Sequence, residues 1–141
     1  MYAVFDDTLV TGNKMIDSQH EELIYRINEL LKSCENEPVD KIRAVRTLDF
    51  LADYTEYHFA EEEKLQKEIG YPGLEAHLKE HEALRQVVRD LYEMLSDQEG
   101  PTEDFVNQVR ENVVEWLYTH IKGFDRSVAE YKFMRDNPGM I

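Results

Sequence analysis

The stretch YPGLEAHLKEHEALRQVVRDLYEML, residues 71–95, carries an apolar helical pattern that is interrupted at two places. Its apolar members recur at the spacing of one helix face: Leu74, Leu84, Val88, Leu91 and Leu95. The same face needs two further members, which fall at His77 and His81. Because a buried polar group without a partner costs about 1 to 3 kcal/mol, a helix that buries two imidazoles must give them partners.

The composition is typical of a globular protein with one domain. Hydrophobic residues make up 42% and charged residues 33% of the 141 residues, enough to build a core without disulfides. We therefore expect residues 1–141 to form a single domain that folds on its own. Cys34 is the only cysteine, which excludes an internal disulfide and a four-thiolate metal site, and we interpret it as an inert helix filler.

The charge balance narrows the set of partners. Thirty acidic against sixteen basic residues give a formal net charge of −14, which repels nucleic acids and anionic lipid surfaces. The first residues, MYAVFDDTLVTG, have neither the basic cluster and apolar run of a secretory signal nor the length of a membrane span. We expect a cytoplasmic protein that binds no nucleic acid and does not insert into membranes.

Four helical patterns with short breaks between them account for most of the chain. They cover approximately residues 18–34, 39–69, 74–97 and 102–122, and a helical C-terminal extension reaches about residue 135. The segment before the first helix is interpreted as a strap, with Asp17 or Ser18 as the helix N-cap. Gly70 ends the second helix, and Gly100 with Pro101 ends the third. This order predicts an all-α, antiparallel up-down-up-down four-helix bundle with an N-terminal strap.

All five histidines lie on the apolar faces of these helices: His20, His58, His77, His81 and His120. On the second helix the apolar face begins at Ile42 and includes Glu62. We expect the neighbouring Glu61, Glu63 and Lys64 to face water. A single buried histidine is usually a structural residue with a hydrogen-bond partner. Five imidazoles and a carboxylate in one core instead favour a shared metal centre, which removes the cost of burying them.

The spacing of four of these residues supports chelation. His58 with Glu62, and His77 with His81, are separated by four residues, so each pair points from one helix face toward a common point. One such pair arises often by chance on a helix surface. Two pairs at buried positions, facing a histidine on each of the other two helices, favour a single metal centre.

A last candidate ligand depends on a distorted helix. His120 and Asp125 are five residues apart, which on a regular helix separates them by about 140°. We predict a wider, π-like turn near Gly123 that brings Asp125 back to the inner face. Without that turn, Asp125 is a surface carboxylate.

Four motifs in this order and spacing resemble those of hemerythrins, particularly the single-domain bacterial forms: IDSQH, HFAEEE, GYPGLEAHLKEH and WLYTHIKGFD. The resemblance extends from about Phe5 to Tyr131 and implies a non-haem di-iron centre in the bundle core. The implied ligands are His77, His81 and His120 for one iron (Fe), His20 and His58 for the other, and Glu62, Asp125 and an oxo or hydroxo group as bridges.

The resemblance also implies reversible binding of dioxygen. These ligands fill all but one of the positions of two six-coordinate irons, and the open position falls on the iron with two histidines. In hemerythrins this position binds O2, which the two ferrous ions reduce and then release in the reverse reaction. The residues implied to line an apolar O2 pocket are equally ordinary core positions: Leu23, Phe59, Trp116, Leu117 and Ile121.

Other functions use similar residues. Ferritin-type di-iron oxidases carry Glu-x-x-His motifs, which this chain lacks, so we expect no enzymatic turnover. A structural zinc site is four-coordinate and does not need so many ligands. An O2 or redox sensor would use the same di-iron site and stays an alternative, with a protein acceptor of O2 or a signalling partner. Phe5 and Leu65 stand where bacterial hemerythrins commonly have tryptophan and methionine, so oxygen affinity does not transfer.

Overall fold

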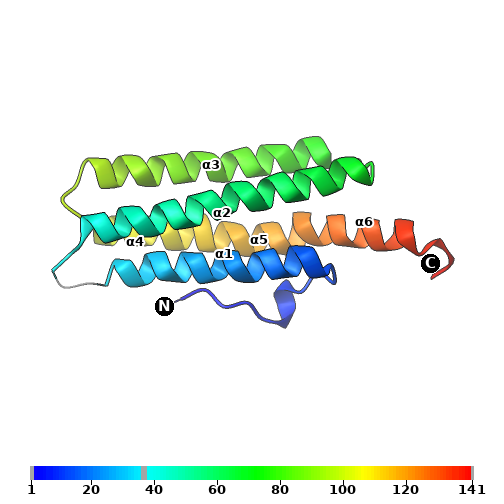
Figure 1. Ribbon diagram of the computed structural model, residues 1–141, viewed down its shortest axis with the longest axis horizontal. Coiled ribbons are helices and arrows are strands. Elements are labelled where there is room, and N and C mark those ends of the chain that lie inside the picture. Colours follow the sequence, from blue (N-terminus) through cyan, green and yellow to red (C-terminus); the bar gives the residue numbers. More distant parts are fainter. Residues whose placement is uncertain (1, 36–37, 141) are drawn as a thin grey trace.

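The protein is an antiparallel bundle of four helical rods (Figure 1). The computed structural model describes residues 2–35 and 38–140, so both ends of the predicted 1–141 domain lie outside the described residues. The rods are α1 (Lys14–Ser33), α2 (Lys41–Glu68), α3 (Leu74–Ser96) and a fourth made of α4 (Glu103–Val109), α5 (Glu115–His120) and α6 (Arg126–Asp136). Consecutive rods pack side by side and run in opposite directions (Figure 1). The predicted all-α, up-down-up-down bundle is confirmed.

Two π-helical turns join the parts of the fourth rod without breaking it. These turns are η2 (Arg110–Val114) and η3 (Ile121–Asp125), and the residues that flank them keep helical backbone angles. The wider turn that the sequence predicted near Gly123 is confirmed as η3. The turn η2 was not expected, because no pair of buried polar residues five apart marks it in the sequence.

The start of α1 differs from the prediction. The helix begins at Lys14 rather than at residue 18, and its N-cap is Asn13, whose side chain accepts a hydrogen bond from the backbone of the first turn. The predicted N-cap, Asp17 or Ser18, is therefore wrong. Asp17 lies inside the helix, where its carboxylate accepts hydrogen bonds from the backbone and the hydroxyl of Thr11. These bonds hold the strap, residues 2–13, against α1 (Figure 1), and helical periodicity does not reveal them.

The core has two different ends. At the end near the α1–α2 and α3–α4 connections its large side chains are apolar and at most 1% exposed: Leu30, Leu48, Leu91, Leu95 and Phe105. Ile42, which the sequence places on the buried face of α2, is 67% exposed, because in the first turn of α2 the inner face is taken by Ala44, which is fully buried. At the α2–α3 end, Gly70 takes a left-handed backbone angle of φ +65° and ends the helix as predicted.

Among the described residues, no helix combines the length and the apolar character that crossing a membrane requires.

Candidate metal centre

Polar side chains from all four rods meet in the half of the bundle away from its apolar end: His20, His58, Glu62, His77, His81, His120 and Asp125. Each of these side chains is at most 1% exposed. The structure thus brings together every residue that the sequence predicted as a metal ligand. The turn η3 is what turns Asp125 inward, one helical turn beyond His120 on the same rod.

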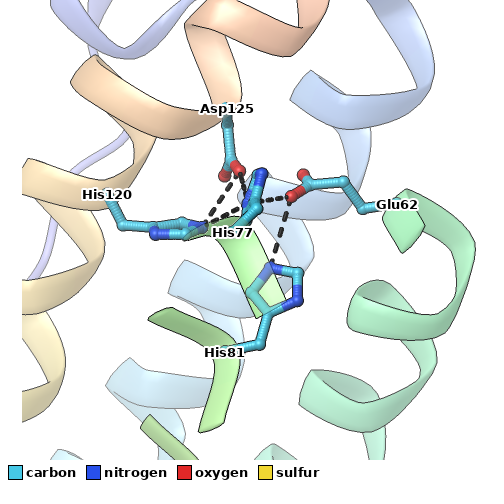
Figure 2. A group of neighbouring side chains, drawn as sticks. All are labelled: Glu62, His77, His81, His120 and Asp125. Atoms are coloured by element: carbon cyan, nitrogen blue, oxygen red, sulfur yellow. Dashed lines mark hydrogen bonds and ion pairs between the residues drawn. The ribbon is translucent and has the colours of Figure 1, made fainter. Parts of the chain in front are cut away.

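The donor atoms form two groups that share both carboxylates. One group contains Glu62, His77, His81, His120 and Asp125, and the other contains His20, His58, Glu62 and Asp125. In each group, one donor atom per residue lies within 4.8 Å of all the others. Figure 2 shows the first group, with Glu62 and Asp125 reaching the imidazole of His77 from two sides. Such sharing fits two metal ions bridged by two carboxylates.

The distances between donor atoms are those expected around a six-coordinate ion. His77 Nε2 lies 2.6 Å from Glu62 Oε1 and 3.0 Å from Asp125 Oδ1. It also lies 2.9 Å from His120 Nε2. On the other side, His20 Nε2 lies 2.6 Å from Asp125 Oδ2. With metal–ligand bonds of about 2.1 Å, neighbouring octahedral ligands stand about 3 Å apart, close to the observed separations.

Several of these atoms have no hydrogen-bond partner among the described residues. They include both carboxylate oxygens of Glu62, Oδ1 of Asp125 and Nε2 of His81, all of them buried. A buried carboxylate oxygen that receives no hydrogen bond is costly, and a cation removes that cost. The donor set therefore fits a pair of metal ions better than it fits a hydrogen-bonded polar core.

Protons and metal ions compete for this site. Burial lowers the pKa of His77, but the neighbouring carboxylates of Asp125 and Glu62 outweigh burial and raise the pKa to about 9. Burial favours a raised pKa for Asp125, but His120 and other imidazoles hold that pKa well below its usual range. Burial lowers the pKa of His58 to about 4, although Glu62 attracts its proton. Metal binding would displace the proton of His77, so metal affinity falls as the pH is lowered.

Residues that were not predicted from the sequence orient the imidazoles. His58 Nδ1 lies 2.6 Å from Gln19 Oε1, and His81 Nδ1 lies 2.8 Å from Glu63 Oε2. The expectation that Glu63 faces water is wrong: it flanks the inner face of α2 and is held by His81, with 18% of its side chain exposed. A proton on Nδ1 leaves Nε2 free to bind a metal at the centre.

A third imidazole has an amide partner. Gln66 lies one turn after Glu62 and places its Nε2 3.0 Å from His77 Nδ1, while its buried Oε1 has no hydrogen-bond partner among the described residues. Turning the amide over exchanges these two atoms and lets His77 Nδ1 donate to Oε1. His77 then presents Nε2 to the centre like the other ligands.

A small apolar cavity adjoins the centre, with room for roughly one molecule the size of water. Its lining includes four of the residues predicted for an O2 pocket: Leu23, Phe59, Trp116 and Leu117. Ile121 is buried in the core but does not line this cavity. The lining also contains residues that were not predicted for the pocket: Ile27, Leu51, Thr55, Leu84 and Val113. Of the histidines, His58 and His120 reach the cavity.

Comparisons with known proteins agree with this geometry. The family profile described as Hemerythrin HHE cation binding domain matches residues 11–131. A bacteriohemerythrin of Stenotrophomonas maltophilia is 34% identical over 127 residues, which is 90% of this chain and 79% of that protein. A bacteriohemerythrin of Aquifex aeolicus is 30% identical over 119 residues, or 84% of this chain and 88% of that protein. The crystal structure of a hemerythrin point mutant has a TM-score of 0.73 at 26% identity and covers 85% of this chain and 88% of that one.

Proposed function

The chain belongs to the hemerythrin family, and we propose that it is an oxygen carrier that binds dioxygen reversibly at a di-iron centre formed by the converging side chains. The observation that carries the proposal is that two ligand groups, one with three histidines and one with two, share Glu62 and Asp125. A single tetrahedral ion does not use two overlapping groups of this kind.

Each ligand has a role in the proposed centre. One iron would be bound by His77, His81 and His120, and the other by His20 and His58. Glu62 and Asp125 would bridge the two, together with an oxo or hydroxo group. When bound, the iron pair supplies two electrons to dioxygen and takes them back on release. With one histidine fewer, the iron held by His20 and His58 would keep a ligand position open.

The surrounding side chains are mostly apolar, which disfavours water and proton donors at this position. The cavity reaches His58, and Leu23 and Leu117 form part of its wall. Thr55 brings a hydroxyl to the lining, but that hydroxyl already donates to the carbonyl of Leu51 at 2.8 Å. Few free donors in the cavity favour the release of unchanged O2, because proton donors promote its irreversible reduction. The role of the cavity as the O2 pocket is part of the proposal.

Oxygen carriage is favoured over two other uses of the same centre. Hemerythrins are oxygen-binding proteins, and we propose that this chain likewise performs no enzymatic turnover. An O2 or redox sensor would need a partner whose binding depends on the state of the centre. A cytoplasmic location stays a prediction of the sequence, and cell fractionation would test it.

Metal analysis combined with an anaerobic optical titration tests the proposal. We expect two irons per chain, one for each ligand group, and a visible charge-transfer band that develops with O2 and fades when O2 is removed. His58→Ala should abolish the band. Glu61→Gln, a charge change in the same turn of α2 outside both ligand groups, should retain it.

Three results would contradict an oxygen carrier. A protein without iron would exclude the centre itself. Continuous consumption of O2 with a reductant would show an oxidase, and an O2-dependent change in association with a partner would show a sensor.

A further inference from the structure

The outer partners of the imidazoles differ in charge between the two halves of the centre. In the two-histidine group, the neutral amide of Gln19 accepts from His58. In the three-histidine group, Gln66 supplies another neutral amide to His77, but His81 donates to the carboxylate of Glu63 at 2.8 Å. Glu63 is therefore the one carboxylate within 3 Å of an outer ring nitrogen among the described residues.

An arginine at the surface holds this carboxylate. Arg85 Nη2 lies 3.7 Å from Glu63 Oε2, and Arg85 Nε donates to both oxygens of Glu56 at 2.9 and 3.0 Å. The Arg85 side chain is 26% exposed. The contacts thus run from solvent through Arg85 and Glu63 to His81.

Arg85 also touches the other neighbour of the same imidazole. Its guanidinium carbon lies 5.2 Å from the ring centre of Phe59, and that ring stacks on His81 at 3.8 Å with an interplanar angle of 9°. His81 is thereby fixed at its face by Phe59 and at its edge by Glu63, and the same cation contacts both. Phe59 in turn lines the apolar cavity.

The charge of the acceptor affects the metal through the ring. A hydrogen bond to a carboxylate is roughly twice as strong as one to a neutral amide, and it shifts electron density onto the imidazole. Such a partner raises the basicity of a metal-bound histidine. A more basic ligand stabilises the ferric ion relative to the ferrous ion, because the ferric ion gains more from electron donation.

We propose that Glu63 is a positioning residue that, through His81, stabilises the ferric state of the three-histidine iron, and that Arg85 limits this effect by neutralising part of the carboxylate charge. This inference rests on the proposed function, since it requires iron at that place. The two halves then have separate tasks. The half beside His20 and His58 offers the open position, and the half beside His81 sets how readily electrons are given up.

Potentiometric titration of the iron-loaded protein tests the proposal with two variants that should shift the midpoint potential in opposite directions. Glu63→Gln keeps the shape but removes the charge, and we expect the midpoint potential to rise by about 59 mV, a tenfold change in the ferric-to-ferrous ratio. Arg85→Gln should lower the potential by a smaller amount, because the carboxylate then acts at full strength. Glu61→Gln and Arg89→Gln remove the same charges without a contact to Glu63 and should shift the potential little.

A second readout does not depend on iron or on oxygen. In zinc-loaded protein with labelled histidines, the Nδ1 proton of His81 should resonate further downfield than that of His58, and Glu63→Gln should move it upfield. Competition with a chromogenic chelator should show a 10- to 100-fold loss of zinc affinity in Glu63→Gln, the usual effect of an outer partner.

The outcomes distinguish a failure of the inference about Glu63 from a failure of the proposed function. The inference is overturned when Glu63→Gln behaves like Glu61→Gln, or when the Glu63 and Arg85 variants shift the potential in the same direction, as a merely structural role would produce. Should Glu63→Gln fail to fold, the sign of the Arg85→Gln shift decides alone. A wild-type chain that binds no pair of irons overturns the proposed function instead.

Discussion

At the end of the bundle where Leu48 and Leu91 are buried, the large core side chains are apolar, whereas around Glu62 and Asp125 the core contains imidazoles and carboxylates. The apolar end is stabilised by the hydrophobic effect and close packing, and it needs no ligand. The site end buries charged groups whose cost is offset only by cations. The apolar end thus stabilises the fold, whereas the site end costs stability that the rest of the fold and the bound cations must offset.

The largest expected effect comes from removing a shared ligand at the site end. Glu62→Ala deletes a carboxylate that belongs to both groups, so we expect iron content to fall from two to at most one per chain. The O2-dependent absorption band should disappear. Iron analysis and optical titration measure both effects, with Glu61→Ala as the control. Retention of both irons would show that Glu62 does not bridge them.

The corresponding change at the apolar end should affect stability and leave the metal alone. Leu48→Ala and Leu91→Ala each leave a cavity among fully buried side chains and should lower the free energy of unfolding by about 2 to 5 kcal/mol. Chemical denaturation measures the loss. Iron content should stay at two per chain, and a loss of iron in either variant would mean that the two ends are not independent.

Metal removal should loosen one end of the bundle only. A ligand present at about 100 times its dissociation constant stabilises the folded state by about 2.7 kcal/mol, and chelation removes that contribution. Hydrogen exchange should therefore accelerate around His77 and His120 and change little around Leu95 and Phe105. Uniform acceleration along the helices would show that the metal stabilises the whole bundle.

Filling the cavity should weaken O2 binding without affecting the metal. Val113→Phe places a larger side chain in the cavity lining, so we expect O2 affinity to fall about tenfold while iron content is unchanged. The added bulk should cost about 1 to 3 kcal/mol of stability. Optical O2 titration and denaturation measure these changes, and an unchanged affinity would remove the cavity from the oxygen pathway.

The smallest effect concerns Cys34, at the apolar end. Burial raises the pKa of its thiol above the ordinary value, so less thiolate is present at any given pH. We expect alkylation at pH 8 to be several times slower than for a free cysteine, and to accelerate as the pH rises. Reaction with a coloured disulfide reagent measures the rate, and a rate equal to that of free cysteine would contradict the inert role.

Much of the bundle and its ligands could be predicted because both leave a periodic signal. His77 and His81 stand out where an apolar helix face is interrupted, and the spacing of His120 and Asp125 required the π turn η3. Contacts between helices leave no such signal. The spacing of Gln19 beside His20 does not reveal that its side chain reaches His58 on another rod.

The contacts of Glu63 and Asp17 also leave no signal in the helical pattern. Glu63 lies where the α2 pattern turns toward solvent, and only the approach of α3 makes it a partner of His81. The start of α1 was predicted too late because the strap, through Thr11, supplies partners to Asp17 that a helix pattern does not contain. The sequence therefore indicates which residues face inward but not which pairs meet there.

The π turn η3 makes the length of the last rod as important as its composition. Closing this turn to regular α geometry without removing a residue would put His120 and Asp125 about 140° apart and rotate everything that follows. Asp125 would then leave the centre, and Arg126 would lose the strap carbonyl of Thr8 to which it donates. In evolution this segment should therefore accept a one-residue change of length only where the width of the turn changes with it, whereas an ordinary surface loop absorbs such a change freely.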